Sequence, residues 1–324
     1  MGNLYKYSIA GLLVILIGAF SLSMYYYNRM AMSQENAGYA HTGDAEILHR
    51  ISLIINNSDN LYWQRFKNGA MDAALENQVA IEFHGIEDAE DVSSAGRQMR
   101  IAVASQKDGV IVNTLDEASY EADVAHLVEN GVLVMTTGVE GGKNSYFVGT
   151  NAFEFGQRAA QLVIRAAGEN ARVAVILDGT TDEIVGFSKV IQQYAESSIE
   201  VIKKTDGHLI GAVDVIQSIL TDYPEVNAIF CMTPEDTLAA AQAIVDRNLV
   251  GDIVVVGTDL TDTPIVRRYI ERNIIYGFIE RNPYDAGFQS VEVLAGVLRG
   301  EFRPTFGTID LDTVTKWDLG QAVR

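Results

Sequence analysis

The sequence is poor in the residues that form covalent cross-links and zinc sites. It contains one cysteine and five histidines. A single cysteine cannot form an internal disulfide, and the histidines show no metal-ligand spacing with one another or with it. Cys231 lies in the apolar run 228–232, so we expect a buried strand residue rather than a nucleophile. The sequence thus predicts neither a bound metal nor a cofactor.

Basic residues and prolines are scarce as well. The chain has 24 Lys and Arg against 43 Asp and Glu, a formal net charge of −19. No basic run offsets this charge locally, so the chain would repel nucleic-acid phosphates, which excludes nucleic acid as a partner. With five prolines and 48% hydrophobic residues, the composition is typical of a packed globular protein rather than a disordered one.

Signatures of catalysis are missing too. There is no Gly-x-Ser-x-Gly elbow. The stretch 141–144 is only superficially like a phosphate loop, because Thr137 and Asn144 stand where a glycine and a Ser or Thr are needed, so it predicts a turn. We find no nucleophile, acid–base pair or metal cluster, and we expect a protein that is not an enzyme.

Charge is absent from one long stretch near the N-terminus. Between Tyr7 and Asn28 there is no charged residue, and roughly 20 apolar residues suffice to span a membrane as a helix. We therefore predict a membrane segment at 8–28. Lys6 before it and Arg29 after it favour an N-terminus inside, which puts the rest of the chain outside the cytoplasm. The apolar run is longer than the h-region of a signal peptide, and no clean small-x-small cleavage site follows it, which favours an uncleaved signal-anchor over a signal peptide.

Beyond the predicted anchor (1–30), residues 31–46 are polar and without a period, typical of a tether. From Ile47 onward, short β-rich runs alternate with stretches whose apolar residues are three or four apart, such as Phe66 and Ala70. The predicted strands are 51–55, 109–112, 132–136, 173–177, 200–203, 228–232, 253–256 and 274–279.

This alternation predicts an α/β fold in which helices cover both faces of parallel sheets. The pattern runs twice, before and after about Asn151, and therefore indicates two similar lobes. Ligands of such sheets bind beyond the carboxyl ends of the strands. If the two lobes face one another, those strand ends line a shared cleft.

The first predicted strand ends in an amide-rich segment. Asn56 and Asn60 both donate and accept hydrogen bonds, which suits hydroxyl groups, and Tyr62 and Trp63 offer aromatic faces for the C–H face of a sugar ring. The alternative is that Asn60 caps the next helix and that one of the two aromatics belongs to the core.

Two charged residues follow later strands. Asp259 ends a buried strand, where a carboxylate can accept from two vicinal hydroxyls, and Thr263 already supplies a cap for the next helix. Ligand contact is therefore favoured for Asp259. Arg281 can offer its planar fork to ligand oxygens, or it can form an ion pair with Asp259 or Glu280.

Three further residues keep two interpretations each. Asn113 ends the strand 109–112 and either contacts ligand or holds a turn. Glu183, in the predicted loop after 173–177, either lines the cleft or is a solvated surface acid. Thr233, before Pro234, indicates a helix start first and a ligand contact second.

The order of these clusters resembles the ribose-type periplasmic sugar-binding proteins, which share their fold with the effector domains of lactose-repressor-type regulators. The resemblance covers roughly residues 47–320. It is carried by residues 51–55 with Tyr62-Trp63, 67–70, 222–230, 256–259, 282–287 and 300–301.

The resemblance implies three crossings between the lobes, near Asn151, Asn282 and Asp312, and a hinge that closes on ligand. The first lobe would comprise 47–150 and 282–312, and the second 151–281 and 313–324. The ligand contacts that it implies are Asn56, Asn60, Tyr62, Trp63, Asn113, Thr233, Asp259 and Arg281.

The sequence departs from the ribose-binder pattern at several of these positions. Gly138 follows Thr137 where ribose binders have an Asp-Arg pair, Glu183 stands in place of a second arginine, and Arg281 stands where Gln is common. Thr233-Pro234 likewise replaces the usual Asn-Asp pair. These changes disfavour ribose itself and leave a modified, amino or charged sugar open.

We expect a membrane-anchored, extracytoplasmic solute-binding protein that closes on a monosaccharide or related polar compound and delivers it to an ABC-type permease. The alternative is a sensing subunit that reports to a membrane partner such as a histidine kinase, since the anchor suits both roles. A transcription regulator is set aside, because the membrane segment occupies the place of its DNA-binding domain.

Overall fold

A computed structural model describes residues 47–56, 61–86, 92–114, 117–138, 145–177, 181–205, 209–261, 263–301 and 303–319. The predicted anchor and tether, the turn at 141–144 and Asn60 lie outside the described residues. Within the described ranges, no helix is both long and apolar enough to cross a membrane.

The first lobe is built on a six-stranded sheet of order β11-β5-β4-β3-β1-β2, in which all pairings are parallel. Its strands are β1 (His49–Asn56), β2 (Val79–Ile86), β3 (Gly109–Thr114), β4 (Leu133–Gly138), β5 (Tyr146–Gly149) and β11 (Phe306–Thr308). Helices α2 (Leu61–Asn77) and α10 (Pro283–Leu298) cover one face, and α3 (Val92–Ala104) and α4 (Glu117–Glu129) the other.

Strand β1 shows why these strands are continuously apolar. Ile51 and Leu53 pack against the core under α2 and α10, whereas Ile54 packs under α3 and α4. Because successive side chains alternate between two covered faces, every residue from Ile51 to Ile55 is buried.

The second lobe repeats this plan with a sheet of order β12-β10-β9-β8-β6-β7. Its strands are β6 (Arg172–Leu177), β7 (Ser198–Lys204), β8 (Ala228–Cys231), β9 (Val254–Thr258), β10 (Ile275–Glu280) and β12 (Asp312–Thr315), the last antiparallel to β10. Helices α5 (Ala152–Ala167) and α6 (Thr181–Ile191) cover one face, and α7 (Leu209–Asp222), α8 (Pro234–Asp246) and α9 (Pro264–Glu271) the other.

The predicted fold class, two α/β lobes with parallel sheets flanked by helices, is confirmed. Each of the eight predicted strands overlaps an observed one, and Cys231 is fully buried in β8, as expected. The sequence interpretation missed β2, β5, β11 and β12, which lie toward the edges of the two sheets.

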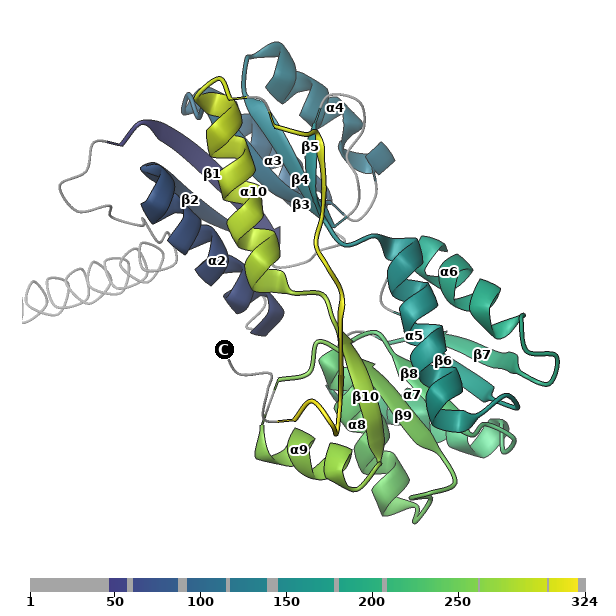
Figure 1. The fold of residues 1–324 in the computed structure, drawn as a ribbon. Coiled ribbons are helices and arrows are strands. Elements are labelled where there is room, and N and C mark those ends of the chain that lie inside the picture. The colour runs from purple at the N-terminus through teal and green to yellow at the C-terminus, as the bar shows by residue number, and fades with distance from the viewer. Residues whose placement is uncertain are drawn as a thin grey trace, which may run out of the picture.

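The described chain passes three times from one sheet to the other: between β5 and α5, between β10 and α10, and between β11 and β12 (Figure 1). Two of these connections are tied together, because the side-chain amide of Asn282 donates to Asp310 O at 2.9 Å and to Asp312 Oδ2 at 3.0 Å. Arg158 on α5 donates to Leu311 O at 2.9 Å, so the helix that follows the first connection is bonded to the third connection.

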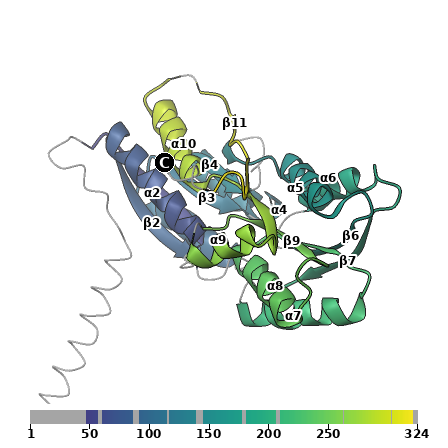
Figure 2. The same ribbon diagram turned by 60° about the horizontal axis from the view of Figure 1, so that its bottom comes forward.

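Glycines let α2 and α10 lie side by side in the first lobe (Figures 1 and 2). A Cβ on Gly69 would lie 2.0 Å from Tyr284 O, and a Cβ on Gly287 would lie 2.0 Å from Phe66 O. The two helix backbones therefore touch where α10 leaves its connection, and this contact fixes the start of α2 against it.

The second lobe uses the same device between α5 and α6. A Cβ on Gly156 would lie 1.9 Å from Glu183 O, and a Cβ on Gly186 would lie 2.1 Å from Phe153 O. In each lobe, the helix that follows a connection is thus packed against the first helix after that lobe's first strand. The N-terminal turns of α2 and α6 are held near the connections in this way.

Candidate functional site

Arg281 brings the two lobes together. It follows β10 in the second lobe, and its Cζ lies 5.2 Å from the ring centre of Tyr62, in the first turn of α2 in the other lobe. On the second-lobe side, the same atom lies 5.5 Å from the ring centre of Phe155 on α5. A cation over aromatic faces is attracted by their quadrupoles, so Arg281 links an aromatic side chain of each lobe.

Asp259 holds Arg281 in this place. Its Oδ2 accepts from Arg281 Nε at 2.6 Å, and its Oδ1 accepts from the backbone N–H of Arg281 at 2.8 Å. The Asp259 backbone is left-handed, with φ 50°, and its N–H donates to Ile279 O at 2.9 Å. The ion pair that the sequence left open as an alternative is therefore present, with Asp259 as the partner.

Glu280 makes a second contact across the lobes. It forms an ion pair with Arg65, which lies one turn after Tyr62 on α2. Two consecutive residues at the end of β10 thus reach two residues on one face of α2. Arg65 was not predicted as a site residue. It lies three residues after Tyr62, and residues three apart on a helix share one face, so this spacing could have indicated it.

The sequence predicted a loop position for Glu183, and this prediction is wrong. Glu183 belongs to the first turn of α6. It is 8% exposed, so it is not a solvated surface acid. Burial lowers the pKa of Arg281, but attraction to Asp259, Tyr62 and Glu183 raises it more, and the net pKa lies above its ordinary value. These four side chains form one electrostatic cluster.

The ionisation of Tyr62 should make the stability of the folded chain depend on pH. Burial, opposed by Arg281 and helped by Asp259 and Glu183, raises its pKa from 10.0 to about 12. Below pH of about 10, Tyr62 is protonated in the folded and unfolded chains alike. Between about 10 and about 12, only the unfolded chain loses this proton, so ionisation favours unfolding and stability falls by up to about 2–3 kcal/mol.

We therefore expect Tyr62→Phe, which cannot ionise, to lose less stability than the wild type between about pH 9 and about pH 11. Urea unfolding at both pH values measures the difference. Equal losses in the two proteins would show that Tyr62 ionises as readily in the folded chain as in the unfolded one.

The remaining predicted site residues make structural contacts. Thr233 Oγ1 accepts from Asp236 N at 3.1 Å and caps α8, which is the helix-start role expected first. The side-chain amide of Asn113 donates to Thr137 O at 3.0 Å, from the end of β3 to β4. Neither contact tests ligand binding by these residues, which stays a prediction.

Trp63 stacks edge-on against Tyr62 at 4.9 Å and against Phe66 at 5.7 Å, and it packs on the first-lobe core. This is the core role left open for one of the two aromatics. Asn56 ends β1, but its side chain, like the whole of Asn60, lies outside what the structure describes. Phe155 is a site neighbour that the sequence analysis missed, because nothing separates it from other apolar residues of α5.

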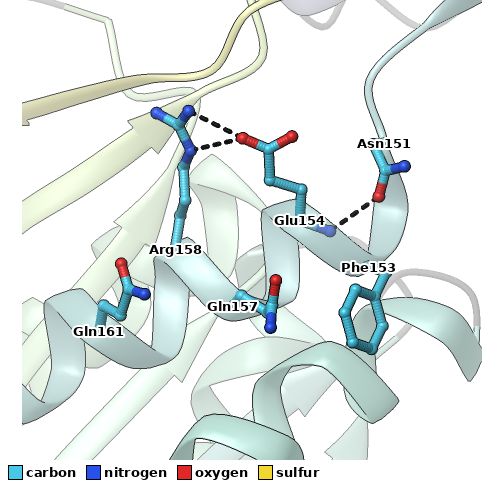
Figure 3. A pocket seen from close by; sticks show the side chains of 6 residues that line it. All are labelled: Asn151, Phe153, Glu154, Gln157, Arg158 and Gln161. Atoms are coloured by element: carbon cyan, nitrogen blue, oxygen red, sulfur yellow. Dashed lines mark hydrogen bonds and ion pairs between the residues drawn. The ribbon is translucent and has the colours of Figure 1, made fainter.

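A hollow of about 570 Å³ lies along α5 (Figure 3). It is lined by Asn151, Phe153, Glu154, Gln157, Arg158 and Gln161. Asn151 Oδ1 accepts from Glu154 N at 2.8 Å, and Glu154 Oε1 accepts from Arg158 Nε at 3.0 Å and Nη2 at 2.8 Å. Because these polar groups cap the helix and pair with one another, they have a structural role.

No group of three or more His, Cys, Asp or Glu side chains is placed to hold a metal ion within the described ranges. The cluster of Tyr62, Asp259, Glu183 and Arg281 offers hydrogen-bonding groups and an aromatic face where two lobes meet. Two α/β lobes joined by three connections, with such groups between them, define the class of two-lobed ligand-binding proteins.

Comparison with known proteins specifies the class further. Residues 51–302 match the model of the periplasmic binding protein domain, so the chain belongs to this family. It is 20% identical over 286 residues to the D-allose-binding periplasmic protein of Escherichia coli K12, covering 82% of this chain and 91% of that protein. The resemblance found in the sequence is thereby confirmed.

Two further proteins show the same likeness. The ribose import binding protein of Salmonella typhimurium LT2 is 24% identical over 295 residues, covering 82% of this chain and 90% of that protein. The solved XylFII–LytSN complex contains a chain with a TM-score of 0.75 and 24% identity, covering 84% of this chain and all (100%) of that one. The structural likeness shows a shared fold.

Proposed function

We propose that this chain is an extracytoplasmic solute-binding protein that closes its two lobes on a monosaccharide or related polar compound and delivers it to an ABC-type membrane permease. The observation that carries the proposal is the cluster at the strand ends, where Tyr62 of one lobe meets Asp259 and Arg281 of the other. Two relatives are named as a D-allose-binding protein and a ribose import binding protein, and these names support a sugar as the ligand.

The site would act by joining the lobes through the ligand. The Tyr62 ring suits the C–H face of a sugar, and the charged groups opposite suit its hydroxyls. A ligand that contacts both lobes stabilises the closed form over open ones. The lobes would be 47–150 with 282–312 and 151–281 with 313–324. Asn56, Asn60, Trp63, Asn113, Glu183 and Thr233 complete the proposed set of ligand contacts.

The apolar, uncharged stretch at 8–28 supports a single membrane anchor with the binding domain outside the cytoplasm. An anchored receptor would stay near its membrane partner at high local concentration. No catalytic role is proposed, and turnover of a bound sugar by the purified protein would contradict this.

A second candidate is a ligand-sensing subunit that reports to a membrane signalling partner such as a histidine kinase. The observation that favours it is that the similar chain XylFII was solved in a complex with LytSN. Uptake of the labelled ligand by cells lacking this chain separates the two roles. Lost uptake supports transport, whereas unchanged uptake with a lost transcriptional response supports sensing.

The primary test follows thermal unfolding of the full chain in detergent against pentoses, hexoses, amino sugars and polyols. A ligand that binds only the folded state raises the midpoint saturably. We expect one sugar class to do so, and we expect Tyr62→Ala to reduce the shift, measured against the variant's own midpoint without sugar. No shift with any compound would contradict the proposed function.

A further inference from the structure

A cluster of three ionisable side chains, separate from the candidate site, lies at the outer edge of the first sheet. Glu82 and His84 are two residues apart on the edge strand β2, so they face the same side of the sheet. Lys107, just after α3, forms an ion pair with Glu82, and His84 Nε2 lies 3.7 Å from Glu82 Oε1. In this edge cluster, one carboxylate therefore lies near two groups that can carry a positive charge.

The edge cluster is largely enclosed by protein. The side chain of Lys107 is 11% exposed, that of His84 15% and that of Glu82 24%. On the neighbouring strand β1, Ile54 pairs with His84 and is fully buried in the core under α3 and α4. Because Glu82 already balances the charge of Lys107, a proton on His84 would add an unbalanced charge beside apolar side chains.

These surroundings favour the neutral form of His84. Burial lowers the pKa of His84 from its ordinary value of 6.5, attraction to Glu82 raises it by less, and repulsion from Lys107 lowers it further. The pKa therefore lies below its ordinary value although a carboxylate is close by.

The other elements packed on β2 bring no further charge to His84 within the described ranges. Helix α2 covers the opposite face of the strand. On α3, Arg97 is exposed and Arg100 forms an ion pair with Asp123 of α4. On β1, Arg50 is exposed. The proton on His84 is thus opposed or favoured by the edge cluster alone.

We infer that the edge cluster is an acid-sensitive switch in the first lobe. While His84 is neutral, the pair of Lys107 with Glu82 holds the end of α3 to β2; when His84 takes up a proton, β2 and α3 separate from the sheet more often. Because β2 pairs with β1 as far as Ile86 and Asn56, this opening reaches the carboxyl end of β1. The switch goes beyond the proposed function and does not depend on what the cleft binds.

The direction and size of the effect follow from the linkage of protonation to opening. Since the pKa of His84 is lowered in the closed edge, the opened edge takes up the proton more readily. The stability of the edge is therefore complete above about pH 6.5 and falls as the pH drops below it. At about pH 5.5, a freely exposed histidine is protonated about tenfold more often than not, so opening is favoured up to about tenfold over its level at about pH 7.5.

The test is amide hydrogen exchange of the full chain in detergent, without ligand, followed by mass spectrometry at about pH 7.5 and about pH 5.5. After correction for the intrinsic exchange rate at each pH, we expect peptides from β2 and α3 to open about threefold to tenfold more at the lower pH. Peptides from β8, in the core of the second lobe, should change by less than about twofold.

His84→Gln removes the titrating ring and keeps a polar side chain, so its β2 peptides should lose this response to acid. His126→Gln, at an exposed position on α4, is the matched control and should respond as the wild type does. Each protein is compared with itself at the two pH values, so a general loss of stability in a variant does not affect the result. An equal response in the wild type and His84→Gln, or none in the wild type, would overturn the inference.

A second measurement follows the proton itself. The ring signal of His84 in the NMR spectrum is assigned by its absence from His84→Gln. We expect it to titrate at a lower pH than free histidine in the wild type, and at a higher pH in Lys107→Gln than in the wild type, because the opposing charge is gone. Titration at the same pH in both proteins, or in the wild type at or above the pH of free histidine, would contradict the switch. As no ligand is used, these results are independent of whether the cleft binds a sugar.

Discussion

Gly287→Ala should lower the free energy of unfolding by about 2 kcal/mol, because overpacking costs about 1–3 kcal/mol and here the obstructing atoms belong to a backbone. The new Cβ would lie 2.0 Å from Phe66 O and 3.1 Å from Ala70 N, both on α2. A backbone carbonyl cannot rotate away as a side chain does, so the helices must separate. The better helix propensity of alanine, worth about 1 kcal/mol, offsets only part of this cost.

Urea unfolding followed by tryptophan fluorescence measures the loss. Gln289→Ala, a half-buried position on the same helix, is the control and should change stability by less than about 0.5 kcal/mol. Gly69→Ala should cost about as much as Gly287→Ala, because its Cβ would lie 2.0 Å from Tyr284 O.

The double variant should lose less than the two single losses together, since helices already moved apart have room for the second methyl group. Wild-type stability in either single variant would contradict the close approach of α2 and α10.

The sequence predicts the inner strands well because they satisfy one simple requirement. Strands such as β6 and β8 are covered on both faces, so every residue between their ends is apolar and the run is unmistakable. Strand β2 lies at the sheet edge and was not predicted, because Glu82 and His84 interrupt its apolar run. Glu82 forms an ion pair with Lys107. Strands β11 and β12, with 3 and 4 residues, are too short to carry a period.

The candidate site was predictable where it depends on strand ends alone. Tyr62, Asp259 and Arg281 follow the carboxyl ends of strands, where ligands of parallel sheets bind, and the structure brings them together. Which of these groups face one another depends on how the two lobes are set relative to each other, and no local pattern encodes that angle. For this reason, the pair of Arg65 with Glu280 and the packing of Phe155 on Arg281 emerge only from the structure.

The ion pair between Arg65 and Glu280 leads to the second large prediction, which concerns the protein without ligand. The pair joins α2 of one lobe to the end of β10 of the other, beside the contact of Tyr62 with Arg281. The chain thus supplies closing contacts of its own. Glu280→Gln should therefore shift the ligand-free population from closed toward open lobes.

The expected size follows from the exposure of the pair. Arg65 is 40% and Glu280 16% exposed, so solvent screens the attraction and the pair contributes about 1 kcal/mol, a change of about fivefold in the ratio of closed to open forms. In the proposed function a ligand contacts both lobes only in the closed form, so the apparent ligand affinity should fall with the closed fraction.

Spin labels at Glu121 on α4 and Glu225 before β8, both exposed, place one probe on each lobe for a pulsed dipolar distance measurement. Glu280→Gln should broaden the distance distribution toward longer values, and saturating ligand should narrow it again. Glu154→Gln is the matched control, since it removes a similar ion pair, with Arg158, that lies within one helix. If both variants gave the wild-type distribution, the Arg65–Glu280 pair would not contribute to closure, and the contact of Tyr62 with Arg281 and the connections would be left to hold the lobes.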